Sequence, residues 1–578
     1  MDRKFFIARS NLEKKDAKTT PYFGDILFKT IHAFTSPGKK SIYLTKKTEF
    51  TMRHYWILFL GIAAMIAGCS QKASAPPTDD ESTEESDSKK KKKGHSSSSN
   101  TTSSSSEAEE LDEDCVGEPG NAWGGTTAKD FACGAGTKLS PYIILTAEQL
   151  AKLSFVVGAN ETEYQGKYYK LGADIILNEG KIIDDKGALV ADSTKLHKWT
   201  PIGNSSVAFT GNFDGDGHTV SGMFINTTST HNGLFGNSSG TVQNLTVENS
   251  WIYGGKFTGG VVGYNVGTVE NLKNYASVSG KEECIGGVIG RSNQKDYKYN
   301  STIKNVLNEG IIVGDKNVGG IAGCATYVTV DGADNTAPIE GYGYVGGIFG
   351  GIGSSAKNDI QNLRNSGDIN GSHFVGGISG HCAGTTSISS KTSSYSCFKD
   401  YGVLCGSLQR ANNDGKITGI RYVGGIVGEV CHGILSELSN TGDVVGEGGT
   451  GGIASSMSYT KTTAVYNTGN IYGIDYVGGV IGYNQEGVTS AAYSTGKVDG
   501  DSLVGLMIGY NYNTTMADYY YLRQGEQEPF GLNNGGGVAT PKTSNEMKSE
   551  DFAKLLGDEF VYDSELNDGY PILKWEEE

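Results

Sequence analysis

The sequence lacks the motifs of several enzyme classes. None of its nine histidines belongs to a His-Glu-x-x-His helix, the usual motif of zinc peptidases. It has no phosphate-binding loop of the P-loop type, and its cysteines show no C-x-x-C or clustered Cys/His spacing. Its carboxylates form no recurring pair beyond those that turns use. We therefore predict no catalytic residue, no metal site and no cofactor.

Positive charge and long apolar runs are also scarce. The formal net charge is -16, and a chain this acidic is a poor partner for nucleic acid. The apolar run from Tyr55 to Ala67 is shorter than the ~20 residues that a membrane-spanning helix needs. The composition therefore excludes a nucleic-acid-binding protein, and this run is typical of an export signal.

Glycine, in contrast, is abundant and periodic. The pattern G-G-(I/V)-x-G is first complete at Gly259-Gly260-Val261-Val262-Gly263. Its second position recurs at residues 233, 260, 287, 320, 347, 377, 425, 452, 479 and 506, and the match is loosest at Leu506, which replaces the second Gly, and at Ser455, which replaces the last. The base period is 27 residues, and three repeats carry insertions of 6, 3 and 21. Self-similarity at such a period predicts a stacked repeat fold.

Each repeat has a second constant part, N-x-G-x-(I/V)-x-G. Its first position holds Asn308, Asn365, Asn413, Asn440 and Asn467, with weaker copies at Asn274, Asn335 and Ser494. Asn and Gly supply turn conformations, and the apolar residues between them alternate as in short strands. We predict an all-β fold, a parallel β-solenoid of about ten 27-residue coils, right-handed because parallel crossovers favour that hand. The recurring Asn is expected to form a structural ladder.

The pattern of residues 1–68 is typical of a targeting region. Residues 1–51 are basic and represent a leader or a mis-called start, and residues 52–68 form a signal peptide. Its end, Ile66-Ala67-Gly68-Cys69, resembles the bacterial lipoprotein signal, although Leu is commoner than Ile at the first position. The resemblance implies that Cys69 is acylated and anchors the chain to a membrane. Residues 69–114 are rich in Ser, acidic residues and Lys, and we expect a disordered linker.

Caps are expected at both ends of the solenoid. In residues 115–203, Thr146 and Gln149 form a capping box before an apolar helical face of Leu150, Leu153 and Val157. The repeats then occupy residues 204–540.

Residues 541–578 are expected to close the far end. Thr543 and Glu546 offer a second capping box, and Phe552, Leu555 and Leu556 form an apolar face. The final aromatic residues are expected to seal the last coil.

The repeats resemble a known family. Gly233-Leu234-Phe235-Gly236, the F-D-G-x-G-H stretch that begins at Phe213, and the series of G-G-(I/V)-x-G strands are similar to the GLUG-motif family of bacterial surface proteins. The resemblance covers residues 140–578. It implies secretion and a β-helical stalk or adhesin-like domain, in some members joined to immunoglobulin A-cleaving metallopeptidases. The peptidase activity does not carry over, because its zinc motif is absent.

All three insertions fall at one position of the coil, in loops 291–303, 351–360 and 381–409. Insertions gathered on one edge are where repeat proteins often place recognition, although they also accumulate where they do no harm. Candidate binding residues there are Tyr297, Tyr299, His381, Tyr395, Phe398 and Tyr401. Such aromatic residues suit contacts with sugars or with protein.

Eight cysteines remain besides Cys69, an even number that suits disulfides in an exported protein. Spacing does not fix their connectivity. The pairs expected first are Cys397 with Cys405, Cys382 with Cys431, and Cys115 with Cys133.

The sequence supports a lipid-anchored protein of the bacterial cell envelope, expected at the outer membrane surface, that binds a host or bacterial surface protein or a glycan. An enzyme acting on polysaccharides, or its carbohydrate-binding accessory, is a second hypothesis, and a purely structural envelope protein is a third. The sequence leaves the ligand and the oligomeric state open.

Overall fold

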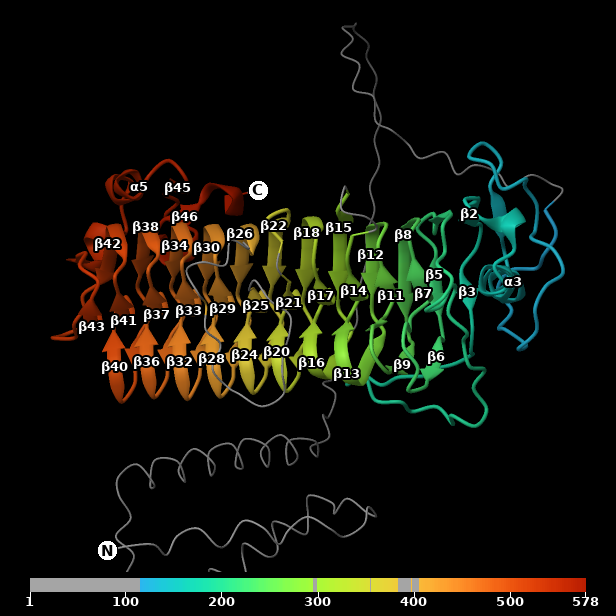
Figure 1. Ribbon diagram of the computed structural model, residues 1–578, viewed down its shortest axis with the longest axis horizontal. Helices are drawn as coiled ribbons and strands as arrows, with labels where there is room; N and C mark the ends of the chain where they lie inside the picture. The colour runs from blue at the N-terminus through green and yellow to red at the C-terminus, as the bar shows by residue number, and fades with distance from the viewer. Residues whose placement is uncertain (1–114, 295–298, 354, 383–396, 398–404, 578) are drawn as a thin grey trace, which may run out of the picture. The chain divides into compact units, whose positions relative to one another are not determined.

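A computed structural model describes residues 115–294, 299–353, 355–382, 397 and 405–577. These residues all belong to one compact unit, Ser106–Glu578. Within it, short parallel strands from successive coils stack side by side into three sheets (Figure 1). The fold is therefore all-β and a parallel β-solenoid, as the repeats predicted. The expected signal peptide, Cys69 and the expected linker lie outside the described residues.

The three sheets have 16, 17 and 11 strands. The 16-stranded sheet holds β1 (Tyr142–Ile144), β2 (Tyr168–Leu171), β3 (Ile175–Ile176), β4 (Asn212–Asp214), β5 (Thr219–Ser221), β8 (Thr241–Glu248), β12 (Thr268–Asn274), β15 (Ser301–Asn308), β18 (Val328–Asn335), β22 (Asp359–Asn365), β26 (Gly406–Asn413), β30 (Gly433–Asn440), β34 (Lys461–Asn467), β38 (Val488–Ser494), β42 (Thr515–Leu522) and β44 (Ala539–Lys542).

The 17-stranded sheet holds β6 (Phe224–Asn226), β9 (Trp251–Gly254), β10 (Thr258–Gly259), β13 (Ser277–Gly286), β16 (Ile312–Gly319), β19 (Ile339–Glu340), β20 (Gly343–Gly346), β23 (Ile369–Asn370), β24 (His373–Gly376), β27 (Ile417–Thr418), β28 (Arg421–Gly424), β31 (Val444–Val445), β32 (Gly448–Gly451), β35 (Ile471–Tyr472), β36 (Asp475–Gly478), β39 (Val498–Asp499) and β40 (Ser502–Gly505).

The 11-stranded sheet holds β7 (Phe235–Ser238), β11 (Val262–Asn265), β14 (Ile289–Ser292), β17 (Ala322–Ala325), β21 (Phe349–Ile352), β25 (Ser379–Cys382), β29 (Val427–Cys431), β33 (Ala454–Ser458), β37 (Ile481–Gln485), β41 (Ile508–Tyr512) and β43 (Phe530–Asn534). The other elements are helices α3 (Ala147–Gly158), α4 (Ser544–Met547) and α5 (Glu550–Leu556), the strand pair β45 (Phe560–Val561) and β46 (Ile572–Leu573), and the 3-10 turns η1 (Thr162–Tyr164), η2 (Asn567–Gly569) and η3 (Lys574–Glu577).

One coil visits the three sheets in order. From β26 the chain turns at the Asn-x-Gly segment, forms β27 and β28, turns again at Gly424-Gly425 and forms β29. The next coil repeats this path in register, so that Leu408 pairs with Leu435 and Val427 with Ala454. Because like residues meet coil after coil, the apolar positions form continuous buried columns, and each buried Leu, Ile or Val stabilises the stack by roughly 1.5–3 kcal/mol.

The solenoid has about 13 turns, which is more than the ten expected. The 16-stranded sheet contains a continuous path from β1 through β2 and β4 to β44. The first of these strands lie in residues 115–203, which we expected to be a cap. They were missed because these coils stack by parallel pairing without carrying the Gly-Gly repeat.

The predicted asparagine ladder is present. Asn274, Asn308, Asn335, Asn365, Asn413, Asn440 and Asn467 are buried, and each Nδ2 donates to the Oδ1 of the next. The Asn413–Asn440 distance is 2.7 Å, and Asn413 Nδ2 also donates to the Gly415 carbonyl at 2.8 Å. The Gly-Gly strand leaves room for the ladder, because a Cβ on Gly425 would lie 2.4 Å from Asn440 Cγ and 2.0 Å from the Gly452 carbonyl oxygen.

Helix α3 covers the first coils, as predicted. The Thr146–Gln149 capping box is formed, and Leu150, Leu153 and Val157 are buried in the same core cluster as the solenoid interior. The Cys115–Cys133 disulfide joins two parts of this region. Figure 1 shows α3 beyond β2 and β3.

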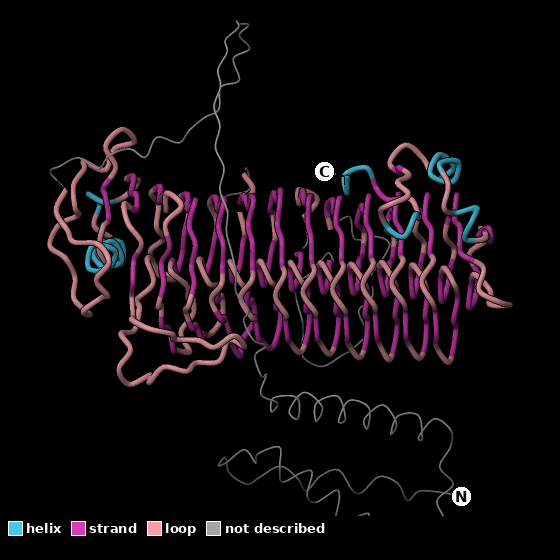
Figure 2. Tube along the Cα trace, turned by 180° about the vertical axis from the view of Figure 1, so that it is seen from behind, coloured by secondary structure: helices cyan, strands magenta, loops and turns pink. Residues whose placement is uncertain are grey.

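The C-terminal segment does not close the last coil. The Thr543–Glu546 capping box forms, and Phe552 and Leu556 are buried, but Leu555 is exposed. The segment instead runs back along the 16-stranded sheet (Figures 1 and 2). There it forms a separate buried cluster with Tyr466, Tyr493 and Tyr520, apart from the core inside the coils.

The last residues of the segment reach the middle coils. The guanidinium of Arg364 on β22 lies over the Trp575 ring, with its Cζ 5.5 Å from the ring centroid. The Ser439 hydroxyl of β30 donates to the Glu576 carboxylate. The final aromatic residues therefore seal the side of the solenoid and not its end. The sequence pattern failed here because the tyrosines of that separate cluster provide an apolar surface that the strand periodicity alone did not reveal.

Candidate functional site

The three insertions share one edge, as predicted. They connect β14 to β15, β21 to β22, and β25 to β26, so each lies where the 11-stranded sheet passes to the 16-stranded sheet. We call this edge the insertion edge. Since the coils stack in register, loops at one coil position emerge side by side along the stack. The edge is therefore the place where the repeat departs most from uniformity.

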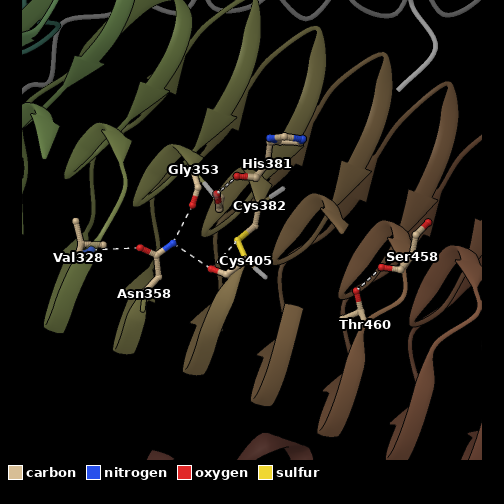
Figure 3. Close-up of a disulfide and its surroundings, with 9 residues drawn as sticks. Val328, Gly353, Asn358, His381, Cys382, Cys405, Ser458 and Thr460 are labelled. Atoms are coloured by element: carbon tan, nitrogen blue, oxygen red, sulfur yellow. Dashed lines mark hydrogen bonds between the residues drawn. A yellow bond between two sulfur atoms is a disulfide. The ribbon is translucent and has the colours of Figure 1, made fainter. Parts of the chain in front are cut away.

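A disulfide closes the base of the longest insertion. Cys382, the last residue of β25, is bonded to Cys405, which immediately precedes β26, with a Cα–Cα distance of 5.5 Å (Figure 3). Both are buried, at 0% and 1% exposure. A second disulfide joins Cys397 inside the insertion to Cys431 at the end of β29 in the next coil. The insertion is thus held at its base and tied to the neighbouring coil.

Two of the disulfide predictions were wrong: Cys397 does not pair with Cys405, nor Cys382 with Cys431. Cys382 lies in register with Val430, and side chains alternate along a strand, so Cys382 points inward while Cys431 points outward. An inward Cys382 therefore meets Cys405 across the corner of its own coil. The outward Cys431 is within reach only of a residue outside the coil, which is Cys397.

The remaining pair, Cys284–Cys324, was not predicted. Cys284 lies in β13 and Cys324 in β17, so the bond joins adjacent coils at the opposite edge of the 11-stranded sheet. The two cysteines are 40 residues apart, which is one 33-residue coil and seven further residues. Only a correct coil register would have shown from the sequence that they lie close together.

Asn358 connects the coils beside the closing disulfide. Its Nδ2 donates to the carbonyls of Gly353 at 2.8 Å and Cys405 at 3.1 Å, and its Oδ1 accepts from the Val328 amide at 3.2 Å (Figure 3). These bonds bind three consecutive coils together at the point where the insertions leave. No sequence pattern singles out Asn358, because this residue does not occupy the recurring Asn position of the repeat.

Only two of the six predicted binding residues can be placed. Tyr297, Tyr395, Phe398 and Tyr401 lie outside the described residues. Tyr299 lies at the insertion edge with 59% exposure. His381 is not in a loop, because β25 extends through it to Cys382. Of the six predicted binding residues, the structure therefore places Tyr299 and His381, and the grouping of all six stays a prediction.

His381 instead points to the outer face of the 11-stranded sheet, opposite Cys382 (Figure 3). Its Nε2 lies 3.4 Å from the Glu429 carboxylate of β29, and its ring centroid is 5.2 Å from that of Tyr344. His381 is nearly buried, with 9% exposure. His381 is therefore a packed side chain of the sheet and not an exposed loop residue.

Three aromatic rings stack beside His381. Phe374 is 4.9 Å from Tyr344 and 4.7 Å from Tyr422, with interplanar angles of 15° and 2°. All three residues have left-handed backbones, with φ of 56°, 56° and 57°. Such a conformation costs roughly 1–2 kcal/mol per residue, which ring stacking of about 0.5–1.5 kcal/mol per pair partly offsets. Burial, with Glu429 nearby, raises the pKa of Tyr422, so its hydroxyl stays protonated at neutral pH.

Two cysteines and a histidine lie close together at the insertion edge. Among the described residues, one potential ligand group has its atoms within 4.8 Å of one another: Cys397, Cys431 and His432. The two sulfurs are bonded to each other, so neither is a thiolate ligand.

The protein belongs to the class of parallel β-solenoids, because its coils stack through parallel strands. Its first end is covered, and its loops emerge along one edge.

In comparisons with known proteins, no family model matches the chain. Two curated proteins are similar over part of it. Halomucin of Haloquadratum walsbyi is 33% identical over 172 residues, which is 29% of this chain and 2% of halomucin.

A second relative, described as a "Putative Gly-rich membrane protein" of Evansella cellulosilytica, is 32% identical over 148 residues. The match covers 25% of this chain and 15% of that protein. The chain thus spans only a small part of either relative.

One solved structure, described as a "putative immunoglobulin A1 protease" from Bacteroides ovatus, aligns with 16% identity and a TM-score of 0.26, over 78% of this chain and 98% of that one.

Within the described residues, no helix reaches the length and apolar character that a membrane crossing requires.

Proposed function

We propose that the chain is a lipid-anchored bacterial cell-surface protein that binds a protein or glycan partner through its insertion edge. The observation that carries the proposal is the insertion edge itself, where three loops emerge at one coil position and two disulfides hold the longest of them. Cross-links that restrict a chain segment lower the entropy cost of binding. The role proposed is binding and not catalysis.

The proposed location is the outer membrane surface. It is supported by the lipoprotein-like sequence that ends at Cys69, by disulfides, which persist in exported proteins, and by the name of the Evansella relative, which is that of a membrane protein. An acyl anchor contributes about 0.8 kcal/mol per buried methylene group.

The anchor is tested by the intact mass and detergent partitioning of native protein and a Cys69→Ala variant. A mature start at residue 69 with added acyl mass, lost in the variant, is the expected result. An unmodified chain that retains residues 1–68 would overturn the anchor and the location.

Binding by the insertion edge is tested by replacing residues 383–404 with a short Gly/Ser linker, together with Cys431→Ser to avoid an unpaired thiol. Adhesion of cells that display this variant is expected to fall while thermal unfolding stays cooperative. A Cys431→Ser and Cys397→Ser variant that keeps the loop is the matched control. Full adhesion by the loop replacement would show that recognition lies elsewhere.

A further inference from the structure

A second surface, separate from the loops, carries a cluster of tyrosines on β37 and β41 of the 11-stranded sheet and on the adjoining β36 of the 17-stranded sheet. We call Tyr476, Tyr483, Tyr510 and Tyr512 the tyrosine patch. Tyr483 pairs in register with Tyr510 and Leu532, while Gln485 pairs with Tyr512 and Asn534. Three successive strands, β37, β41 and β43, therefore present two parallel rows on the outer face.

The rings of the patch are rigidly arranged. Tyr483 and Tyr510 stack with centroids 5.3 Å apart and an interplanar angle of 11°, and Tyr476 meets both edge-on. Tyr476 and Tyr512 are 39% and 43% exposed. All four residues lie on strands, so contact with a ligand would require little ordering of the chain.

Polar groups border the rings at hydrogen-bonding distance. The Tyr483 hydroxyl lies 3.1 Å from Gln485 Oε1, and Asn534 Nδ2 lies 3.4 Å from the Tyr510 hydroxyl. Burial, followed by the neighbouring tyrosines, raises the pKa of Tyr483, so its phenol remains neutral at physiological pH. The patch thus combines flat aromatic faces with neutral hydroxyl and amide groups.

The rest of the same outer face is occupied by internal contacts. The residues in register with Tyr483 along the sheet include Cys324 in a disulfide, and His381 beside Glu429. Arg291 lies over Phe257 at 5.5 Å. The row also holds Tyr264 in an early coil, where its ring packs against His231 and Phe257. Among the described residues of this row, two tyrosines stand next to each other only at Tyr483 and Tyr510.

We propose that the tyrosine patch binds a neutral polysaccharide chain. The alternating apolar faces and hydroxyl edges of sugar rings match aromatic rings bordered by amides. Because the protein carries a net charge of -16 and the patch supplies no cation, an acidic polymer is disfavoured. A flat, strand-borne surface suits an extended polymer, whereas protein hot spots are desolvated pockets at the centre of an interface.

The test is native gel electrophoresis of the full chain in detergent, in gels that contain a soluble glucan, mannan or xylan, or polygalacturonate as the acidic probe. At least one neutral polymer is expected to retard the protein, and polygalacturonate is not. Tyr512→Ala should weaken this affinity about five-fold, since one ring contact is worth roughly 1 kcal/mol. Tyr510→Ala combined with Tyr512→Ala should weaken it more than ten-fold.

Two variants control for loss of structure. Tyr342→Ala removes a tyrosine of similar exposure, 57%, at a distant position and should bind like the native protein. Tyr512→Phe should retain most of the affinity, because the ring is kept. The replacement of residues 383–404 should also leave retardation unchanged, which separates this proposal from recognition at the insertion edge.

Several outcomes would overturn the proposal: no retardation by any of the three neutral polymers, retardation by polygalacturonate alone, or equal retardation of the native and doubly substituted proteins. A dimer that dissociates on substitution of the patch, detected by light scattering, would show instead that a second copy covers it.

Discussion

At the residue scale, the buried asparagines hold neighbouring coils together. Asn413 Oδ1 accepts from Asn365 at 2.7 Å, while its Nδ2 donates to Asn440 and to the Gly415 carbonyl. Each amide therefore satisfies groups in two other coils. A substitution at one position leaves polar atoms without partners on both sides.

We expect Asn413→Ala to lower the free energy of unfolding by about 2–4 kcal/mol, because buried polar groups that lose their partners cost about 1–3 kcal/mol each. Urea denaturation measures this difference. Asn370→Ala, at an exposed position of β23, is the control and should change stability by less than about 0.5 kcal/mol. Equal effects of the two substitutions would contradict the structural role of the ladder.

Single residues also show where sequence analysis reaches its limit. The Asn and Gly turns were predictable because they recur at a fixed spacing, but glycine is required there by close packing and not by a left-handed backbone, since a Cβ on Gly415 would lie 2.1 Å from the Gly367 carbonyl oxygen. Arg410, Ala464 and Ala491, however, have φ of 53° at a bend inside the strands of the 16-stranded sheet. Tertiary stacking overrides their local preference, whereas earlier coils carry Asn271, Asn305 and Asn362 at the same bend, a residue type that favours this conformation.

The exposed tyrosines were missed for a related reason. Tyr476, Tyr483, Tyr510 and Tyr512 belong to regular coils without insertions, whereas the sequence directed the search to the insertions. Only the register that aligns Gln485 with Tyr512 and Asn534 shows that they share a face.

At the scale of elements, the disulfides give a direct test of the coil register. Peptide mapping without reduction should recover linked fragments that contain Cys382 with Cys405 and Cys397 with Cys431. Replacing Cys397 and Cys431 by Ser should lower stability by about 2–4 kcal/mol, the usual contribution of a native disulfide. Linked fragments that join Cys382 to Cys431 would contradict the register of β25 and β29.

The C-terminal segment should respond to pH through Glu576. Its largely buried carboxyl accepts from Tyr466 at 2.9 Å and from the Leu573 amide at 2.8 Å, and burial raises its pKa above the ordinary 4.5. A raised pKa means that the Glu576 carboxyl binds its proton more tightly when the C-terminal segment is packed against the sheet than when the segment is unfolded. Protonation of Glu576 therefore stabilises the packed segment fully below pH 4.5, and this stabilisation is lost as the pH rises through the raised pKa.

We accordingly expect residues 543–577 to be better protected from hydrogen exchange at pH 5 than at pH 7, after correction for intrinsic rates. Glu576→Gln should keep the protection nearly constant between these two pH values. The neighbouring Glu577 is exposed, and Glu577→Gln should behave like the native protein. A pH response that survives in Glu576→Gln would assign it to another group.

At the scale of the whole molecule, the two ends of the described solenoid differ. Helix α3 covers the first coils, whereas the C-terminal segment lies along the side and leaves β43 and β44 at the end of their sheets. Pro541 within β44 and Pro529 just before β43 remove backbone donors there. Exposed sheet edges pair readily with other chains, and such prolines reduce this risk.

Removal of residues 115–166 should therefore expose β2 and cause association that rises with protein concentration, measurable by light scattering. Removal of residues 543–578 should lower thermal stability without association, because that segment covers a face and not an edge. If the protein without residues 543–578 associates and the protein without residues 115–166 does not, the C-terminal segment and not α3 protects a sheet edge.

The cross-links also bear on how the stack would respond to mechanical tension. In a parallel solenoid the interstrand hydrogen bonds run along the stacking direction, so a pull in that direction opens them one coil at a time. No disulfide joins the coils that follow Cys431 among the described residues, whereas Cys397–Cys431 and Cys284–Cys324 bridge earlier ones. Peeling from the last coil would therefore lengthen the protein by about one coil at a time as far as Cys431, where the bond to Cys397 passes the load to the insertion of the preceding coil.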